Sequence, residues 1–460
     1  MRPPTRRDAL RLAAAGFVAL AGCSSDGGGT ETTQTSATTE QTTTATTTTT
    51  ERTTQTTTSP DAQRETALRI TRLLGDGDFE AVHGLLAERV REQSSPDGLR
   101  SAWEQTTAEF GPFTGTSGVE RTTANGNDVL VVRATFEAGV LSVVVTFDDA
   151  DEIIGLRFVS PQSAYSPPAY ADQSAFSETD LSLSSPACEL GATLTTPADG
   201  ADAGVVLVHG SGPNDRDGTL GPNKPLKDIA WGLASEGVAV LRYDKRTYAC
   251  DAATDELGFG PLVVDDALTA LSRLRSETDV SETAVVGHSL GGYAAPRIAD
   301  RDGDASAFML AANSRPLYAI VPGQIRYLAN LDGSVGEAER EQIEAAEATA
   351  DRLANGNYED GGFAWGASFW RDVADYDPVS VAAELDAPAY ALQGGRDYQV
   401  SPTEDFPAWQ EVLPNDRARL YDDLNHLFIA GEGQPNPSEY FQPGNVAEAV
   451  VTDLAEWLTA

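Results

Sequence analysis

The chain has 460 residues, enough for two or three domains, and 40% of them are apolar, which suits a soluble protein with a buried core. Its 70 acidic and 32 basic residues give a formal net charge of −38. Nucleic acids and anionic lipid headgroups would be repelled by this charge, so neither is expected as a partner. Lysine occurs only at Lys224, Lys227 and Lys245. An acidic chain that keeps Arg but has little Lys is typical of adaptation to high salt.

Residues 1–23 are predicted to be an export signal. They begin with a basic stretch that contains Arg6 and Arg7, followed by an apolar run too short to span a bilayer. The arginine pair resembles a twin-arginine signal, which exports folded proteins. Leu20 to Cys23 resemble a lipobox, in which Cys23 is lipidated and becomes the first mature residue. This resemblance implies a lipid-anchored protein on the extracellular face of the membrane, and an ordinary signal peptide is the alternative.

Two segments are expected to act as connections. Residues 24–60 are rich in Thr with scattered Ser, Gly, Gln and Glu, and such a composition cannot bury a core, so it predicts a disordered tether. Residues 161–180 are rich in Pro, Ser and Ala and are predicted to be a linker.

Residues 61–160 are predicted to form a small α+β domain, because helical spacing is followed by alternating strands with tight turns. The expected elements are helices over 64–93 and 98–113, then strands over 127–139 and 140–160. The segment resembles the small domain of unknown function that often precedes bacterial and archaeal hydrolases. A binding or spacer role is expected for it.

Residues 181–460 are predicted to form an α/β domain, because strand-like and helix-like segments alternate and so indicate βαβ units with a mostly parallel sheet. The alternating segments are 207–212, 225–246, 265–277, 283–289, 304–313, 387–397 and 418–428. Between about 316 and 376 the pattern changes to a long polar helical stretch. This stretch is predicted to be an insertion that lies over the end of the sheet as a lid.

Ser289 is the candidate nucleophile. It lies in Gly-His-Ser-Leu-Gly, between an apolar strand and a helix of small residues, and Gly287 and Gly291 permit the tight turn that such a junction needs. The turn exposes the serine hydroxyl and directs a helix N-terminus towards it. This arrangement resembles the α/β-hydrolase fold. A serine in an ordinary loop would explain neither the flanking glycines nor the strand.

A nucleophilic serine needs a base, and the chain has only four histidines. His83 lies in the preceding domain, His209 ends a strand before a Gly-rich turn, and the side chain of His288 is expected to point into the fold. His426 follows the last apolar strand and fits the chain order nucleophile, acid, base.

Asp397 is the candidate acid, because it follows the penultimate strand and a Gly pair and precedes the base. Its role would be to fix the imidazole tautomer and to stabilise the imidazolium. Asp405 and Asp423 are competitors. Two backbone N–H groups are expected to bind the developing oxyanion, those of Leu290 and of Ser211 in the Gly-rich turn.

Cys188 and Cys250 are the remaining cysteines. An exported protein can join them in a disulfide, and two free buried thiols are an equal alternative. No histidine lies near either in the sequence, so no metal site is expected.

Motifs over residues 181–460 resemble those of EstD-type esterases, relatives of the serine aminopeptidase-like hydrolases. They are VLVHGSGPNDRDG, LRYDKRTY, VVGHSLGGYAAPRIA, LQGGRDYQV and LNHLF. The resemblance implies a carboxylesterase that acts on small acyl esters without metal or cofactor. A peptidase or amidase with the same triad is one alternative, and a cell-surface binding protein with a vestigial hydrolase domain is another. Oligomeric state cannot be predicted.

Overall fold

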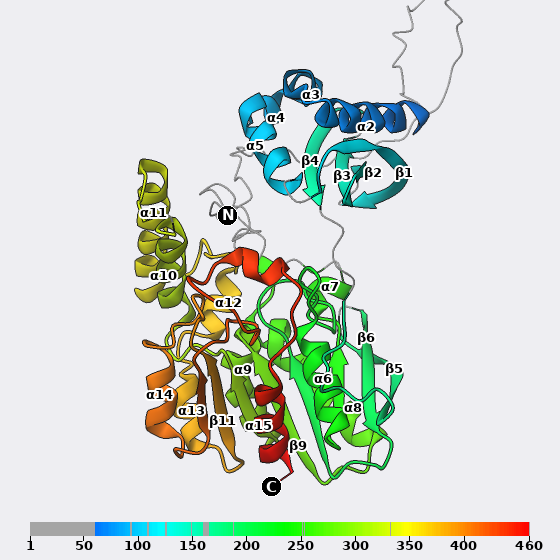
Figure 1. Cartoon of the computed structure of the whole chain (residues 1–460). Coiled ribbons are helices and arrows are strands. Elements are labelled where there is room, and N and C mark those ends of the chain that lie inside the picture. Colours follow the sequence, from blue (N-terminus) through cyan, green and yellow to red (C-terminus); the bar gives the residue numbers. More distant parts are fainter. Residues whose placement is uncertain are drawn as a thin grey trace, which may run out of the picture. The chain divides into compact units, whose positions relative to one another are not determined.

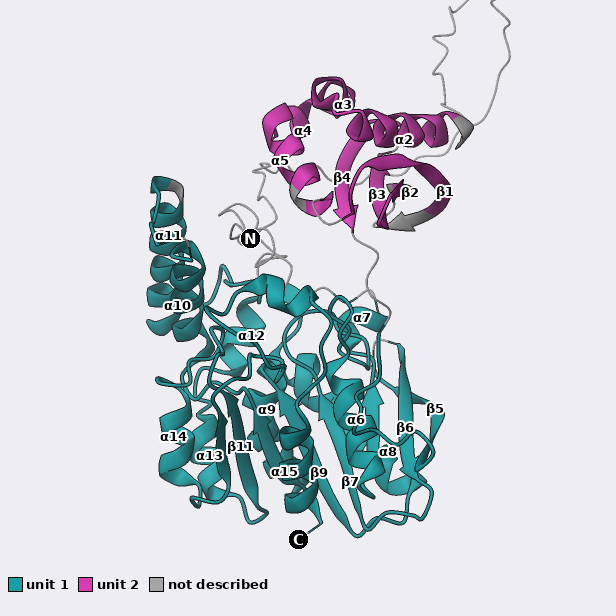
Figure 2. Ribbon diagram, viewed as in Figure 1, with its two compact units in different colours: residues 1–26, 164–460 teal, residues 27–163 magenta. Residues whose placement is uncertain are grey.

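The computed structural model describes residues 60–459, except for 93, 108–109, 125–126, 149, 160–164, 187, 251, 253 and 332. The predicted signal peptide, its Cys23 and the Thr-rich tether up to residue 59 lie outside the described residues. The described chain divides into two compact units, one within residues 27–163 and the other within 164–460 (Figure 2).

In the N-terminal unit, helices precede an antiparallel meander of order β1-β2-β3-β4 (Figure 1). The described elements are α2 (Pro60–Gly75), α3 (Phe79–Leu85), α4 (Glu88–Glu92), α5 (Pro96–Thr107), β1 (Phe113–Ala124), β2 (Asn127–Phe136), β3 (Gly139–Phe147) and β4 (Ile153–Val159). Alternate residues of the sheet, such as Val143 and Val145, are fully buried together with Ile70 and Leu74 of α2. One face of the meander therefore packs on the helices, which is the expected α+β arrangement.

The C-terminal unit is built on a sheet whose described strands have the order β12-β11-β10-β9-β7-β8-β6-β5. The strands are β5 (Phe176–Ser184), β6 (Glu189–Pro197), β7 (Ala203–Val208), β8 (Ala239–Tyr243), β9 (Glu282–His288), β10 (Ser306–Leu310), β11 (Ala389–Gly394) and β12 (Ala418–Tyr421). Strand β6 runs antiparallel to β5 and β8, and the remaining pairs are parallel. The prediction of a mostly parallel sheet is confirmed.

Helices lie on both faces of this sheet (Figure 1). They are α6 (Pro225–Ser235), α7 (Arg246–Ala249), α8 (Asp265–Glu277), α9 (Leu290–Asp302), α10 (Leu317–Ala329), α11 (Glu337–Ala354), α12 (Ala367–Asp372), α13 (Pro378–Glu384), α14 (Phe406–Val412) and α15 (Glu448–Leu458), with shorter turns η1 (Thr254–Glu256), η2 (Gly260–Val264) and η3 (Pro437–Phe441). Val205 and Leu207 of β7 share a cluster with α6 and α15, whereas Val206 and Val208 share one with α8 and α9. Burial on both faces explains why this strand is a continuous apolar run.

The order of the strands fixes where the loops meet. Strand β8 lies next to β7 on one side, and the following strand of the chain, β9, lies next to β7 on the other side. The loop after β7 and the turn after β9 therefore open at the same edge of the sheet. In parallel sheets this switch of direction forms a crevice at the carboxyl ends of the strands, where ligands bind.

The stretch predicted as a lid contains α10, α11 and α12. The predicted linker, by contrast, packs on the C-terminal unit in its described part. The hydroxyl of Tyr165 donates to Asp228 and that of Tyr170 to the backbone oxygen of Val446, each at 2.8 Å, and β5 already begins at Phe176. Tyrosine combines an apolar ring with one polar tip, so both residues can anchor an otherwise irregular segment.

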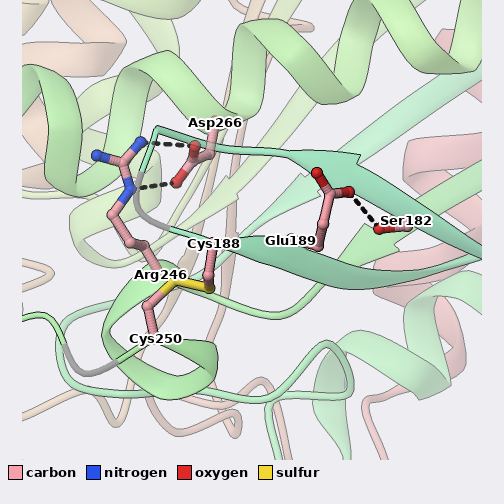
Figure 3. Close-up of a disulfide and its surroundings, with 6 residues drawn as sticks. All are labelled: Ser182, Cys188, Glu189, Arg246, Cys250 and Asp266. Atoms are coloured by element: carbon pink, nitrogen blue, oxygen red, sulfur yellow. Dashed lines mark hydrogen bonds and ion pairs between the residues drawn. A yellow bond between two sulfur atoms is a disulfide. The ribbon is translucent and has the colours of Figure 1, made fainter.

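A disulfide joins Cys188, just before β6, to Cys250, just after α7, with 5.9 Å between the Cα atoms (Figure 3). Of the two alternatives for these cysteines, the structure therefore has the disulfide. Arg246, at the start of α7, forms a buried two-bond ion pair with Asp266 of α8, at 2.7 and 3.0 Å (Figure 3). Short helix α7 is thus fixed to the sheet at one end and to α8 at the other.

Candidate active site

Ser289 occupies the sharp turn between β9 and α9. Its backbone has φ 55° and ψ −116°, a conformation that L-residues rarely adopt, and its N–H donates to the oxygen of Leu310 at 2.9 Å. A Cβ on Gly287 would collide with the carbonyl group of Gly291, and one on Gly291 would collide with the carbonyl oxygen of Val208. The glycines are therefore needed for close approach, and the strained turn holds the serine at the carboxyl end of the sheet.

His426 and Asp397 are in direct contact. Nδ1 of His426 lies 2.7 Å from Oδ2 of Asp397, and both side chains are buried. The carboxylate also accepts hydrogen bonds from Gln393 Nε2 at 3.0 Å and from the backbone N–H groups of Gln399 and Val400 at 2.8 and 3.0 Å. Because a carboxylate accepts, Nδ1 of His426 carries the proton and Nε2 is left as an acceptor.

The competing aspartates have other surroundings. Asp405 is fully buried, and Arg315 binds it through two side-chain hydrogen bonds at 3.0 and 2.7 Å. Asp423 is exposed. Of the three candidate acids, only Asp397 contacts His426.

Ser289 and His426 line one cavity, but in the part of the chain that the structure describes they share no hydrogen bond. In an unliganded hydrolase this bond is often long and shortens only when substrate binds. The cavity holds about 300 Å³. It is bounded by the loop after β7, by α10 through Gln324 and Leu328, and by the segment around Tyr440.

His288 lies in the wall of this cavity, although the sequence suggested that its side chain points into the fold. Its Nε2 donates to the backbone oxygen of His426 at 2.8 Å, and the two rings are 4.8 Å apart. His209 is also buried in the wall, edge-on to Tyr243. Burial lowers the pKa of both His209 and His288 to about 3, so both are neutral at physiological pH. Only the scarcity of histidine in the chain could have pointed to a supporting role for His288.

The two expected oxyanion donors are at the edge of the same site. Leu290 is the first residue of α9, so its N–H has no partner within the helix. A Cβ added to Gly210 would lie 3.2 Å from the Cβ of Ser289, which shows how closely the loop after β7 approaches the serine. Ser211, the next residue, lines the cavity.

The lining of the cavity carries no Asp, Glu, Lys or Arg among the described residues, in a chain with 102 such side chains. Apolar side chains such as Leu220, Leu226 and Phe441 form one part of the wall. Polar neutral groups, including those of Asn214 and Gln399, form another. The cavity therefore suits a small uncharged ligand with an apolar part.

Within the described residues, no group of three or more His, Cys, Asp or Glu side chains is arranged to hold a metal ion. None of the described helices combines the length and the apolar character needed to cross a membrane.

Two family models match the chain. The alpha/beta hydrolase family matches residues 205–452, and a protein of unknown function (DUF3887) matches residues 67–156. Esterase EstD from Thermotoga maritima is 34% identical over 404 residues, which are 86% of this chain and 95% of that protein. The similarity therefore spans both units and nearly the whole relative.

Solved structures also resemble the chain. Proline iminopeptidase from Mycobacterium smegmatis is 16% identical, with a TM-score of 0.39 over 61% of this chain and 98% of that one. An esterase from Pyrococcus furiosus is 15% identical, with a TM-score of 0.38 over 64% and 98% of the two chains. These scores are low, so they do not help to choose between an esterase and a peptidase.

Proposed function

The chain belongs to the alpha/beta hydrolase family and is a carboxylesterase-type hydrolase, and on that premise we propose that it cleaves small acyl esters with Ser289, His426 and Asp397. The observation that carries this proposal is the 2.7 Å contact between His426 and Asp397, because it leaves Nε2 of the imidazole as a base in the cavity of Ser289.

The reaction would proceed in two halves. In the first, Ser289 Oγ attacks the acyl carbon while Nε2 of His426 takes the hydroxyl proton, and the negative charge moves to the carbonyl oxygen. The N–H groups of Ser211 and Leu290 would bind that oxyanion. The carbon–oxygen bond to the alcohol then breaks, and the alcohol leaves with the proton from His426. An acyl-enzyme remains on Ser289.

The second half repeats the steps with water. His426 takes a proton from the water as its oxygen attacks the acyl carbon, and the oxyanion forms again. The bond to Ser289 Oγ breaks, the proton returns to the serine, and the carboxylic acid leaves. Asp397 would keep the imidazole in one tautomer and stabilise its charged form throughout.

The neutral cavity favours an ester over an aminopeptidase substrate. An enzyme that binds the free α-amine of a peptide needs a carboxylate in its site, and none lines this cavity in the described part of the chain. A volume of about 300 Å³ is at the lower end of the range for small-molecule sites, about 300–1,000 Å³. Esters with short, uncharged acyl groups are therefore the proposed substrates.

The proposal is tested with a panel of nitrophenyl esters of increasing acyl length, in high salt, for the wild type and Ser289→Ala. We expect a burst of nitrophenol from the wild type and the fastest turnover on the short esters. In the folded Ser289→Ala variant, kcat should fall by about 10⁴-fold or more, because the nucleophile is gone.

Equal ester turnover by the variant would exclude Ser289 as nucleophile. A wild type that cleaves aminoacyl nitroanilides but not esters would favour the peptidase, and an inactive wild type would favour a binding protein.

A further inference from the structure

Lys245 is a buried cation close to the proposed site. Its side chain is almost completely shielded from solvent, and its Nζ donates to the backbone oxygen of Gly210 at 2.6 Å. The other two lysines of the chain, Lys224 and Lys227, both face Asp217. Among the residues that the structure describes, Lys245 has no ion-pair partner. Burial accordingly lowers the pKa of Lys245 to about 7.

A buried ammonium without a carboxylate partner destabilises a fold, so a functional role would explain why Lys245 is there. The peptide group that Lys245 binds indicates this role. The carbonyl of Gly210 and the N–H of Ser211 are the two ends of a single planar peptide group, and none of the described peptide bonds is cis. In a trans peptide these ends point in opposite directions. A cation bound at the carbonyl end therefore turns the N–H end away from itself and makes that hydrogen more positive.

Other contacts hold the same loop from the same side. Nδ2 of Asn214 donates to the backbone oxygens of Ser211 and Gly212 at 2.9 and 3.1 Å and lies 3.4 Å from that of Gly210, a longer contact than the 2.6 Å from Lys245. The backbone N–H of Lys245 donates in turn to the oxygen of Asn214 at 3.0 Å. Carbonyl groups along the loop are thus engaged by Asn214 and Lys245. In the described part of the chain, the N–H groups of Ser211 and Gly212 donate to no backbone oxygen, so they are available to bind an anion.

The ammonium is itself held in place. Lys245 directly precedes α7, whose first residue, Arg246, is paired with Asp266 (Figure 3). The residue after α7, Cys250, is bound covalently to Cys188 (Figure 3). The segment that carries the lysine is therefore anchored at two points to the core of the C-terminal unit.

We propose that Lys245 is a positioning residue for ester hydrolysis, which fixes and polarises the Gly210–Ser211 peptide so that the Ser211 N–H stabilises the oxyanion. The inference rests on the proposed function. The oxyanion carries its full charge only at the tetrahedral stage and not in the bound ester. Loss of the ammonium should therefore lower kcat and leave KM nearly unchanged.

The test compares kcat and KM on a short nitrophenyl ester for the wild type, Lys245→Met, Lys245→Gln and Lys245→Arg. Methionine keeps the chain length without charge or donor, glutamine keeps a neutral donor, and arginine keeps the charge. We expect kcat to fall about 10–100-fold in Lys245→Met, less than the loss of a whole oxyanion donor, with KM within about threefold. Lys245→Gln should fall between Met and wild type, and Lys245→Arg should recover part of the rate.

Lys227→Met is the matched control, because Lys227 faces Asp217 and makes no hydrogen bond with the Gly210–Ser211 peptide among the described residues, and its kcat should equal that of the wild type. Circular dichroism verifies that each variant is folded. If Lys245→Met does not fold, Lys245→Gln alone decides, with an expected loss of about tenfold.

Values of kcat within about threefold of wild type for folded Lys245→Met or Lys245→Gln, or a loss seen only in KM, would overturn the inference. Ser289→Ala in the same assay separates the two proposals. If the wild type has no esterase activity, or Ser289→Ala retains it, the proposed function fails. If both proteins behave as expected, the lysine variants test only the role of Lys245.

Discussion

At the scale of single residues, the contacts of two buried aspartates separate the acid that serves the imidazole from the acid that serves the fold. Asp397→Asn keeps the shape of the side chain but removes the charge opposite His426, so the wrong imidazole tautomer becomes accessible. We expect kcat to fall by about 10⁴-fold in the folded fraction, and the melting temperature to fall too, because an amide cannot accept the hydrogen bonds from both Gln393 Nε2 and the backbone N–H groups. Asp405→Asn is the comparison variant. It weakens the ion pair with Arg315, in which the carboxylate is fully buried, so it should lower the melting temperature and leave most of the activity in the folded fraction.

The two neutral histidines of the cavity make stability depend on pH. In the unfolded chain each has a pKa near 6.5, whereas in the folded protein the pKa of His209 and of His288 is about 3. Between these values the unfolded state binds more protons, so stability is complete above about pH 6.5 and is lost as the pH falls. Each histidine should lower the free energy of unfolding by about 2 kcal/mol when the pH falls from 7 to 5.

Urea unfolding at pH 7 and pH 5, in high salt, measures this loss. In His288→Gln, whose amide can still donate to the oxygen of His426, the loss of unfolding free energy should be smaller than in the wild type by about 2 kcal/mol. Equal losses in the two proteins would show that folding does not lower the pKa of His288.

Much of the proposed site could be predicted from the sequence, because Ser289, Asp397 and His426 each lie within a few residues of the end of a strand. The supporting residues could not. Gln393 contacts Asp397 only four positions away, but no sequence pattern marks a side chain that orients a carboxylate. His288 and Lys245 contact residues 138 and 35 positions away, and no local pattern marks such contacts.

At the scale of elements, the disulfide closes a long loop between the start of β6 and the end of α7. The cysteines are 62 positions apart, and in the chain-entropy model a loop of this size stabilises the fold by about 4 kcal/mol. The double variant Cys188→Ser/Cys250→Ser should lose a free energy of unfolding of this order, measured with urea. Reduced wild type is the control and should resemble the variant. If reduction and substitution both leave the unfolding midpoint unchanged, the two cysteines are not paired.

Element types were more predictable than their limits. The alternation of strands and helices over residues 181–460 predicts the parallel sheet, because buried strands must be apolar on both faces. The start of β5 at Phe176 could not be predicted from the sequence, because β5 is an edge strand with mostly exposed, polar residues. The sequence around Tyr165 and Tyr170 predicts a linker, because it has no periodic pattern. These tyrosines anchor the segment through hydrogen bonds to Asp228 and Val446, which lie far along the chain.

At the scale of the whole molecule, the charge of −38 sets the conditions in which the fold is stable. Repulsion among exposed carboxylates opposes folding, and salt screens it over about 3 Å at 1 M. Raising KCl from about 0.1 to 2 M should therefore raise the melting temperature markedly. The same series at pH 4 is the control and should give a smaller rise, because part of the carboxylates is then neutral. A melting temperature at pH 7 that does not respond to salt would contradict the prediction.

The uncharged cavity also bears on how a catalytic cycle ends. Hydrolysis of a neutral ester produces an acid that ionises on release, and among the described residues lining the cavity no lysine or arginine offers a counter-charge to retain it. The surrounding protein is strongly negative, and its repulsion opposes the attraction that the N–H groups of the oxyanion site exert on the ionised acid. Accumulated acid should thus compete weakly with fresh ester, and the enzyme can keep turning over while its product builds up around it.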